Sequence, residues 1–392
     1  MGLGVYLTAR LSRWRRHSLD DLTAWTGMLV LPPPLDTGAA TERYDDGVER
    51  RLMALEEPVR FWLDGRTLHV EARTSSLGPG YHAALVGALD AMAAKAGLTW
   101  SEVEDDTGFF AARDVPALEH AFTTFFENLC RGVLDIIEEE GTSGFAVQIA
   151  LGARPVLDGR IATPLGPRDR GFFEHPDPRA HFPWWEQGLT PAVRERLATA
   201  LLWSHFPWRS PLDEGEEAIG ALVLSLMQGQ SSDLPLDEVR KIMAREEERP
   251  PQPGAIGYRR GDMTVRLPSG WQIDMPGHFW GEPEGERGTM IYWFGPRAIR
   301  ITTFRFDGRF DPEEILAESD AEVRESHTDH VITADFTEND EGDGRYTLLS
   351  ARIEAAGRSA LVTVTLDGET ADAAGRDWAL RVVRSIQPPS PD

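Results

Sequence analysis

The segment Arg245–Gly254, which reads REEERPPQPG, divides the chain into two parts. Its charged side chains offer nothing to a hydrophobic core, and its three prolines lack a backbone N–H donor and hold φ near one value. Helical patterns dominate the sequence before this segment, whereas short strands and one closing helix follow it. We therefore predict two domains of the α+β class, joined by a linker at residues 245–257.

The two predicted domains differ in their mixture of elements. Residues 1–244 are expected to form an N-terminal α+β domain with additional helices, including a helical subdomain at about residues 190–244. Residues 258–387 are expected to form an antiparallel sheet with helices, an α/β/α sandwich, and residues 388–392 a disordered tail. A length of 392 residues fits this division, because single cores rarely grow so large.

The formal net charge of -24 argues against a nucleic-acid partner, since phosphate contacts require a basic face. It favours a protein partner that carries basic residues, although an acidic surface also serves general solubility. Cys130 is the only cysteine, which excludes an internal disulfide and suits a reducing compartment. No apolar stretch has the length of a signal peptide or of a membrane span, so we predict a cytoplasmic protein.

The first 27 residues show an amphipathic helical pattern, with Leu7, Leu11 and Trp14 on one stripe and Ser18 as an N-cap. Such a helix either docks on its own domain or binds a membrane surface or a partner. Further along, two strand patterns flank the hairpin signal Asp64-Gly65, and two helical patterns follow them.

A strand with the sequence FAVQIAL and a hairpin around Asp158-Gly159 complete the order ββααββ. This order predicts a sheet that carries its helices on one face.

The strongest candidate for a ligand site is the strand-to-helix turn SSLGPGYH at residues 75–82. Glycines let a backbone approach a ligand, and a helix N-terminus offers free N–H groups to an anion. A guanidinium could add charge there, and an imidazole could serve as an acid or a base. Gly-Pro-Gly is also ordinary turn punctuation, and the sequence lacks GxxxxGK[ST] and GxGxxG. The candidate ligand-binding residues are Arg73, Ser75, Ser76, Gly78, Gly80 and His82.

A second group of ligand-type residues contains His327, Asp329, His330 and Asp335. Zinc needs three or four ligands in a fixed geometry, and this stretch leads into a predicted strand. We therefore interpret it as a solvated loop and predict neither a metal nor a cofactor. Glycosidase chemistry needs two carboxylates on opposite sides of a cleft, which acidic residues adjacent in the sequence do not provide. We therefore interpret the runs of acidic residues as exposed charge.

The C-terminal part combines an opening strand with LPSGW (Leu267–Trp271), a meander of antiparallel strands and a closing helix that ends in RSI (Arg384–Ile386). In these features residues 258–387 resemble the PsbP and DcrB-like α/β/α sandwich superfamily. The acidic stretch TENDEGDGR departs from that pattern, as does the lack of a lipoprotein signal. The resemblance implies a binding module that acts as an assembly factor, adaptor or chaperone, and it implies no catalytic residue.

From these observations we predict that the protein is a non-catalytic bacterial protein-interaction module, such as an adaptor, a chaperone or an immunity-type factor. It would bind a protein partner through acidic and aromatic surfaces. The alternatives are a hydrolase or a small-anion-binding protein, with its site at the turn of residues 75–82.

Overall fold

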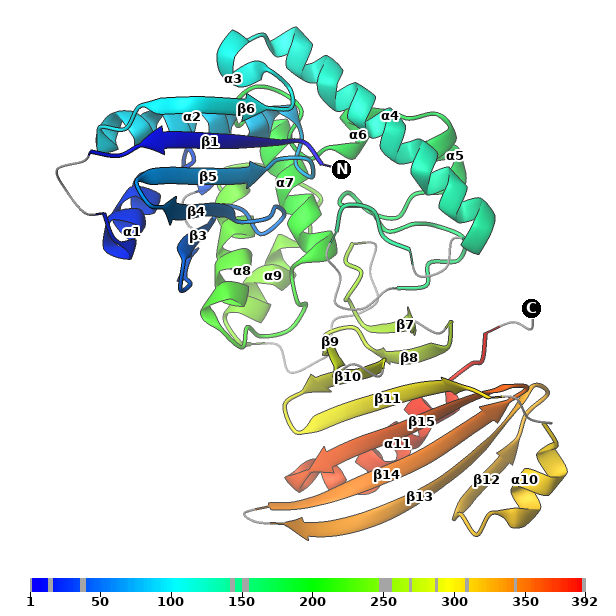
Figure 1. Ribbon diagram of the computed structural model, residues 1–392. Helices are drawn as coiled ribbons and strands as arrows, with labels where there is room; N and C mark the ends of the chain where they lie inside the picture. The colour runs from blue at the N-terminus through cyan, green and yellow to red at the C-terminus, as the bar shows by residue number, and fades with distance from the viewer. Residues whose placement is uncertain are drawn as a thin grey trace. The chain divides into compact units, whose positions relative to one another are not determined.

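The computed structural model describes residues 2–12, 17–35, 40–141, 145–149, 155–246, 256–267, 270–285, 288–306, 310–341 and 344–389 (Figure 1). The chain divides into two compact units, and the main boundary falls between Tyr258 and Arg259. Both units combine helices with antiparallel sheets, so the predicted α+β class is confirmed. Most of the predicted linker lies outside the described residues.

The first unit is built on a six-stranded sheet with the order β2-β3-β4-β5-β1-β6, in which every neighbouring pair is antiparallel. The strands are β1 (Gly4–Arg10), β2 (Ala40–Arg43), β3 (Gly47–Arg51), β4 (Val59–Asp64), β5 (Thr67–Arg73) and β6 (Trp100–Asp105). The predicted hairpin at Asp64-Gly65 is confirmed, because Asp64 pairs with Thr67 and Gly65 adopts a φ of 59°.

The amphipathic helix predicted at the N-terminus is wrong for residues 4–10, which form the inner strand β1. The side chains of Val5, Leu7 and Ala9 are buried, and this alternation has the period of a strand. Helix α1 (Leu19–Met28) begins only after Ser18, whose N–H donates to Asp21 Oδ2 at 3.1 Å. Pairing with β5 and β6 and burial of alternate side chains therefore make this segment a strand, although the spacing of its leucines fits a helix.

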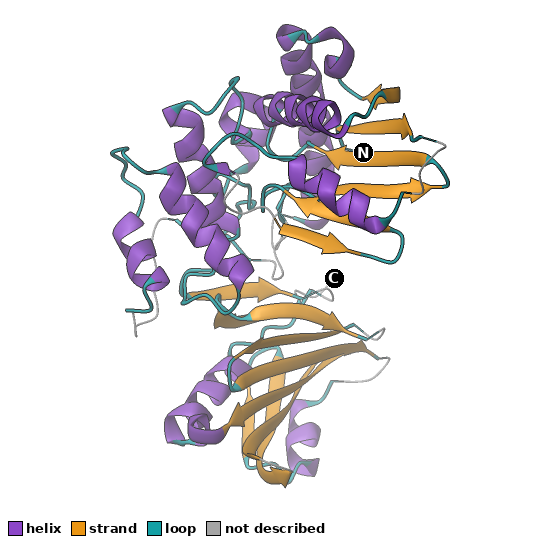
Figure 2. Ribbon diagram, turned by 90° about the vertical axis from the view of Figure 1, so that its left-hand side faces the viewer, coloured by secondary structure: helices purple, strands orange, loops and turns teal. Residues whose placement is uncertain are grey.

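Helix α1 contacts strands β2, β3 and β4 and packs against α2, while α7, α8 and α9 pack on one another. In Figure 1 strand β1 lies in front of α2, and Figure 2 shows helices beside the same sheet. Leu68, Val70 and Ala72 of β5 are buried on the helix-covered face. Besides α1, the helices are α2 (Pro79–Ala96), α3 (Phe109–Ala112), α4 (Val115–Glu140), α5 (Arg170–Glu174), α6 (Pro178–His181), α7 (Pro191–Ser204), α8 (Glu214–Leu226) and α9 (Leu236–Met243).

The second unit has a seven-stranded antiparallel sheet with the order β12-β13-β14-β15-β11-β10-β9 and a separate hairpin, β7-β8. The strands are β7 (Asp262–Arg266), β8 (Gln272–Pro276), β9 (Trp280–Glu284), β10 (Thr289–Phe294), β11 (Arg297–Arg305), β12 (Val323–Ser326), β13 (His330–Glu341), β14 (Gly344–Ala355) and β15 (Arg358–Asp367). Helix α11 (Ala373–Arg384) buries Val382 and Val383 in the same core as Trp271 and Ile273. Helix α10 (Pro312–Glu318) buries none of its side chains.

The tight turn predicted at Asp158-Gly159 is present, with φ values of 45° and 78° and bridge residues on both sides, but the flanking segments pair elsewhere and do not form the predicted two-stranded hairpin. The N–H of Val156 donates to the carbonyl of Thr264 at 2.8 Å, and Ile161 instead pairs with Arg168. Residues 155–158 therefore belong to the second unit and residues 159–258 to the first. In the described part of FAVQIAL only Ala146 makes a strand-like bridge, and it does so with Ala162.

Within the described ranges, no helix combines the length and apolar character that crossing a bilayer requires.

Candidate functional site

The turn of residues 75–82 lies between β5 and α2, as the sequence predicted. Several of its backbone donors, however, are used within the protein. The N–H of Gly80 donates to the carbonyl of Trp184 at 3.1 Å, and the N–H of Ser76 donates to the Glu56 carboxylate at 2.9 Å. Trp184 in turn donates to the carbonyl of Leu77 at 2.9 Å. The N–H of Gly80, in the first turn of α2, is therefore already paired.

The two glycines of the turn are explained by packing. A Cβ atom on Gly80 would lie 2.3 Å from both the Glu186 carbonyl oxygen and the Trp184 Cδ1 atom. Gly78 has a φ of 110°, and a Cβ there would lie 2.7 Å from the Trp184 carbonyl oxygen. The glycines thus allow the aromatic segment around Trp184 to approach α2 closely.

His82 is fully buried and forms part of a polar cluster. Its Nδ1 lies 2.9 Å from Thr74 Oγ1, and its Nε2 lies 3.2 Å from Thr107 Oγ1 and 3.4 Å from Asp105 Oδ2. Burial alone would raise the pKa of Asp105. The hydrogen bond from His82 and those from the backbone of Phe110 and Thr107 outweigh it and lower this pKa to about 2. The cluster joins the end of β5 to the corner after β6.

The other predicted residues of the turn do not complete a catalytic pair. None of the hydrogen bonds in the described part of the chain joins Ser75 or Ser76 to His82. Arg73 makes an exposed ion pair with Glu57 at 3.4 Å. The predicted residues therefore do not meet in one site: Ser76 contacts Glu56, Arg73 contacts Glu57, and His82 belongs to its own polar cluster. The turn is a packed junction.

Two further residues, Gln148 and His181, extend this junction. Gln148 Nε2 donates to the carbonyl of Ser75 at 2.6 Å, and Gln148 Oε1 lies 2.6 Å from His181 Nε2. His181 is buried and stacks on Phe126 at 4.3 Å. Burial lowers the pKa of His181 to about 3, with a further contribution from Arg168 and Arg196. Its imidazole is therefore neutral at neutral pH.

The opposite face of the N-terminal sheet, which no described helix covers, carries a row of charged side chains. The register places Glu42, Glu49, Arg60, Glu71, Tyr6 and Glu104 side by side across all six strands. The neighbouring row contains Gly47, Trp62, His69, Thr8 and Glu102. These two rows, which we call the outer face, hold five glutamates and one arginine.

The centre of the outer face is aromatic. Trp62 and His69 stack with ring centroids 5.1 Å apart and an interplanar angle of 9°. Tyr6 lies against the same pair, because its hydroxyl is 2.5 Å from His69 Nδ1 and its ring is 6.1 Å from that of Trp62. Three rings from β1, β4 and β5 therefore form one partly exposed patch among the carboxylates.

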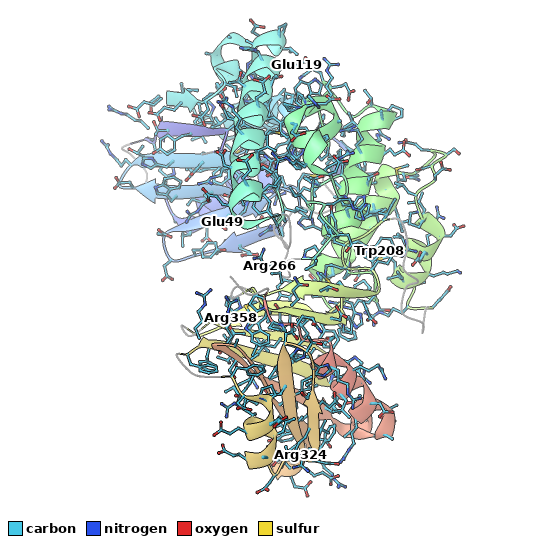
Figure 3. The ribbon with its side chains drawn as sticks, turned by 90° about the vertical axis from the view of Figure 1, so that its right-hand side faces the viewer. Glu49, Glu119, Trp208, Arg266, Arg324 and Arg358 are labelled. Atoms are coloured by element: carbon cyan, nitrogen blue, oxygen red, sulfur yellow. The ribbon has the colours of Figure 1, made fainter. Side chains whose placement is uncertain are left out.

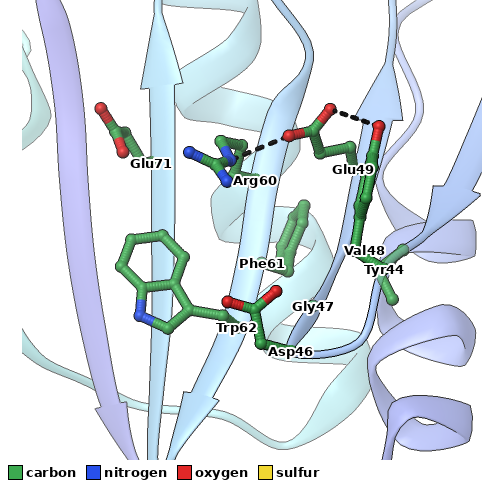
Figure 4. A pocket seen from close by; sticks show the side chains of 9 residues that line it. All are labelled: Tyr44, Asp46, Gly47, Val48, Glu49, Arg60, Phe61, Trp62 and Glu71. Carbon is green, nitrogen blue, oxygen red and sulfur yellow. Dashed lines mark hydrogen bonds and ion pairs between the residues drawn. The ribbon is translucent and has the colours of Figure 1, made fainter.

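A small pocket of about 180 Å³ opens on this face between β3 and β4 (Figure 4). Arg60 Nε lies 2.9 Å from Glu49 Oε1, and the Tyr44 hydroxyl lies 3.2 Å from Glu49 Oε2 and 2.8 Å from Glu42 Oε2. The hydrogen bond with Glu42 is the main reason why the pKa of Tyr44 rises to about 12. Glu71 and Trp62 line the same pocket.

The carboxylates of the outer face also affect the pKa of Tyr6, which lies at its centre. The pKa of Tyr6 is raised by burial and by the nearby carboxylates of Glu104, Glu102 and Glu71. Carboxylates therefore flank the aromatic patch on both sides.

The residues weighed as a metal cluster do not form one. His327 and His330 stack at 4.4 Å, while Asp329 Oδ1 lies 2.7 Å from His330 Nδ1. Across the described ranges, no three histidine, cysteine or acidic side chains gather in a way that could hold a metal ion.

No protein-family model matches the sequence, and no curated protein matches it either. Among solved structures, the crystal structure of a protein from Bacteroides thetaiotaomicron is similar to part of the chain, with 13% sequence identity and a TM-score of 0.27. The similarity covers 32% of this chain and 48% of the other, so it spans about half of that protein. A likeness of this size carries no conclusion about function.

Proposed function

We propose that the chain is a non-catalytic protein-interaction module whose outer face binds a basic segment of a protein partner. The observation that carries this proposal is the pair of cross-strand rows, in which five glutamates and one arginine surround the Tyr6, Trp62 and His69 rings. The antiparallel pairing of the strands fixes the spacing of these side chains across the face.

The charge pattern favours a cationic partner. The single arginine of the two rows, Arg60, is paired with Glu49, so Glu71, Glu102 and Glu104 contribute negative charge that no partner in the rows offsets. Complementary charges raise association rates and select the partner more than they raise affinity. A lysine- or arginine-rich surface would gain from this potential, and the gain would fall as salt is added.

The aromatic patch adds binding energy to the proposed interface that its carboxylates alone would not provide. Tryptophan and tyrosine dominate the energetics of protein interfaces, and a tryptophan face attracts an arginine or lysine cation. Trp62 is partly exposed, lies at the centre of the face and is held in place by its stack on His69. We therefore assign the largest share of the binding energy to Trp62.

The first test is affinity capture from the native host with the wild-type chain and the variant Glu71→Gln/Glu104→Gln. We expect a stoichiometric partner to be retained about tenfold less by this variant at low salt. The matched control is Glu127→Gln/Glu139→Gln, which removes the same charge from the exposed side of α4 and should retain the partner fully. Equal retention by both variants would refute the assignment to the outer face.

A second prediction concerns the anchor. Trp62→Ala should weaken the captured complex about thirtyfold, which corresponds to about 2 kcal/mol. The control is Trp280→Ala, because Trp280 is an exposed tryptophan on a strand of the other sheet. Surface plasmon resonance with the captured partner measures both. A loss shared by the two variants, or absent from Trp62→Ala, would contradict the role of Trp62.

We also propose that the second unit is a member of the PsbP and DcrB-like superfamily. Its antiparallel sheet with α11 packed on one face supports this proposal. An experimental structure of the unit whose strand order differs from that of the superfamily would refute it.

We propose further that the protein acts in the cytoplasm. Its single cysteine, Cys130, is buried as a free thiol, and burial raises its pKa to about 12. Recovery of the native protein from the cell envelope after fractionation of the host would contradict this location.

A further inference from the structure

Strand β6 forms one edge of the six-stranded sheet, and no described element pairs with its other side (Figure 1). In an antiparallel ladder, alternate residues turn their N–H and C=O groups toward the neighbouring strand, and the residues between them turn these groups the opposite way. The backbone of β6 therefore presents donors and acceptors that β1 does not use. An exposed edge of this kind can accept a strand from another chain.

The side chains along this edge alternate in chemistry. Glu102 and Glu104 belong to the two rows of the outer face, whereas Val103, which lies between them, projects from the other face of the sheet. Val103 is a large hydrophobic side chain that is 39% exposed. The row that contains Glu49, which Figure 3 labels, ends at Glu104. The β6 edge thus presents an acidic, an apolar and an acidic residue in succession.

Both carboxylates are exposed and can meet a cation. Within the described part of the chain neither Glu102 nor Glu104 makes an ion pair, and Glu102 Oε2 accepts only a long hydrogen bond from Thr8 Oγ1 at 3.4 Å. Opposite charges placed directly across from each other on neighbouring strands stabilise a sheet. A lysine or arginine on an added strand would therefore gain from either position.

The same charges disfavour a second copy of this chain as the added strand. Two copies of β6 that paired in antiparallel register about Val103 would place Glu102 of each copy opposite Glu104 of the other. Like charges directly opposite each other destabilise a strand pair. The acidic edge therefore selects a basic strand both by attracting it and by repelling its own copy.

The other sheet edges suit a basic strand less well. Strands β2 and β12 each carry an arginine beside a glutamate, Arg43 and Arg324, so the charge along these edges is mixed. Strand β9 contains Pro283, which has no backbone N–H to offer an added strand. Acidic residues at alternate positions, without an arginine or a proline among them, distinguish the β6 edge from these three.

We propose that the basic segment of the partner binds as an additional strand on β6, with lysine or arginine at two alternate positions and an apolar residue between them. The two cations lie opposite Glu102 and Glu104, and the apolar residue covers Val103. The register of β6 with β1 shifts between Thr8 and Ala9, so the regular part of the edge begins at Glu102. This inference rests on the proposed function and specifies the conformation and spacing of the partner segment.

The test uses the full chain and a labelled peptide whose central residues are lysine-valine-lysine-valine-lysine, with binding measured by fluorescence anisotropy. A peptide of the same composition in the order lysine-lysine-lysine-valine-valine controls for charge alone. We expect the alternating peptide to bind one-to-one and at least about tenfold more tightly than the control peptide. Glu102→Gln/Glu104→Gln should remove most of this difference, whereas Glu127→Gln/Glu139→Gln, on the exposed side of α4, should leave it unchanged.

Backbone methylation of the peptide separates strand addition from side-chain binding across the outer face. One peptide carries N-methyl groups on its two valines, and another carries them on two of its lysines. An added strand pairs through the N–H groups of alternate residues, so one of these peptides loses its pairing groups and the other keeps them. We expect their affinities to differ at least about tenfold. Binding through side chains alone predicts equal affinities.

Three results would overturn the proposal: no saturable binding of the alternating peptide, equal binding of the alternating and control peptides, and equal binding of the two methylated peptides. The methylated peptides require no variant of the chain, so this comparison does not depend on the folding of a variant. If they bind equally while Glu71→Gln/Glu104→Gln still reduces capture of the partner, the outer face remains the binding surface and only strand addition fails. If that variant also captures the partner as the wild type does, the proposed function fails too.

Discussion

Gly80→Ala is expected to lower the free energy of unfolding by about 3 kcal/mol. The new Cβ atom would lie 2.3 Å from the Glu186 carbonyl oxygen and from the Trp184 ring, so either the aromatic segment or the start of α2 must move. Such a movement would also break the hydrogen bond from the Gly80 N–H to the Trp184 carbonyl. Denaturant unfolding followed by circular dichroism measures the effect.

The same helix offers a control of opposite sign. Gly87 is an exposed residue in the middle of α2, and a Cβ atom there would meet no other atom within 4 Å. Gly87→Ala should therefore stabilise the protein by about 0.5–1 kcal/mol, because alanine has the higher helix propensity. If Gly80→Ala proved as neutral as a surface substitution, the turn would not be a packed junction and a ligand role for its glycines would regain support.

Glu56→Gln is expected to stabilise the protein at high pH and to have no effect at low pH. Burial raises the pKa of Glu56 to about 8, against an ordinary value of 4.5, while the Ser76 N–H partly opposes this rise. A raised pKa means that the folded protein holds a proton that the unfolded chain releases. The stability linked to Glu56 is thus fully present below pH 4.5 and is lost as the pH rises toward about 8.

The expected difference in unfolding free energy between Glu56→Gln and the wild type grows by about 3 kcal/mol from about pH 5.5 to about pH 8, since one pKa unit corresponds to about 1.4 kcal/mol. His181, whose pKa is lowered to about 3, titrates in the unfolded state in the same window with the opposite sign. Its contribution cancels when the two proteins are compared at each pH. A difference that stays constant across this window would show that Glu56 is ionised in the folded protein.

Local sequence signals correctly predicted the turns and helix ends that depend only on nearby residues. Asp64-Gly65 specified a hairpin, and Ser18 the start of α1, where its N–H donates to Asp21 Oδ2 at 3.1 Å. These features depend on contacts within a few residues, so composition and spacing reveal them.

Strand β1 could not be predicted because its conformation depends on distant partners. The spacing of Leu7 and Leu11 fits a helix, yet β1 pairs with β5 on one side and with β6 on the other. The pairing of Pro155 and Val156 could not be predicted for the same reason, since their partners Val265 and Thr264 lie in the second unit more than a hundred residues away. Non-local pairing of this kind leaves no periodic signal.

The outer face could not be predicted from the sequence either. The acidic and aromatic character of a binding surface was predicted, but Tyr6, Arg60 and Glu104 come together only through the sheet register. At the predicted turn, His82 was a candidate acid or base because its burial between Thr74 and Asp105 has no sequence signature.

The most direct test of the central claim, that the outer face binds a basic partner, is the affinity of the captured partner measured over a series of salt concentrations. For the wild-type chain the affinity should fall steeply with salt, because exposed charges are screened beyond about 10 Å at 0.1 M. For Glu71→Gln/Glu104→Gln the affinity at low salt should be lower and its dependence on salt shallower. Parallel salt curves for the two proteins would contradict the claim and would place the interface elsewhere on the chain.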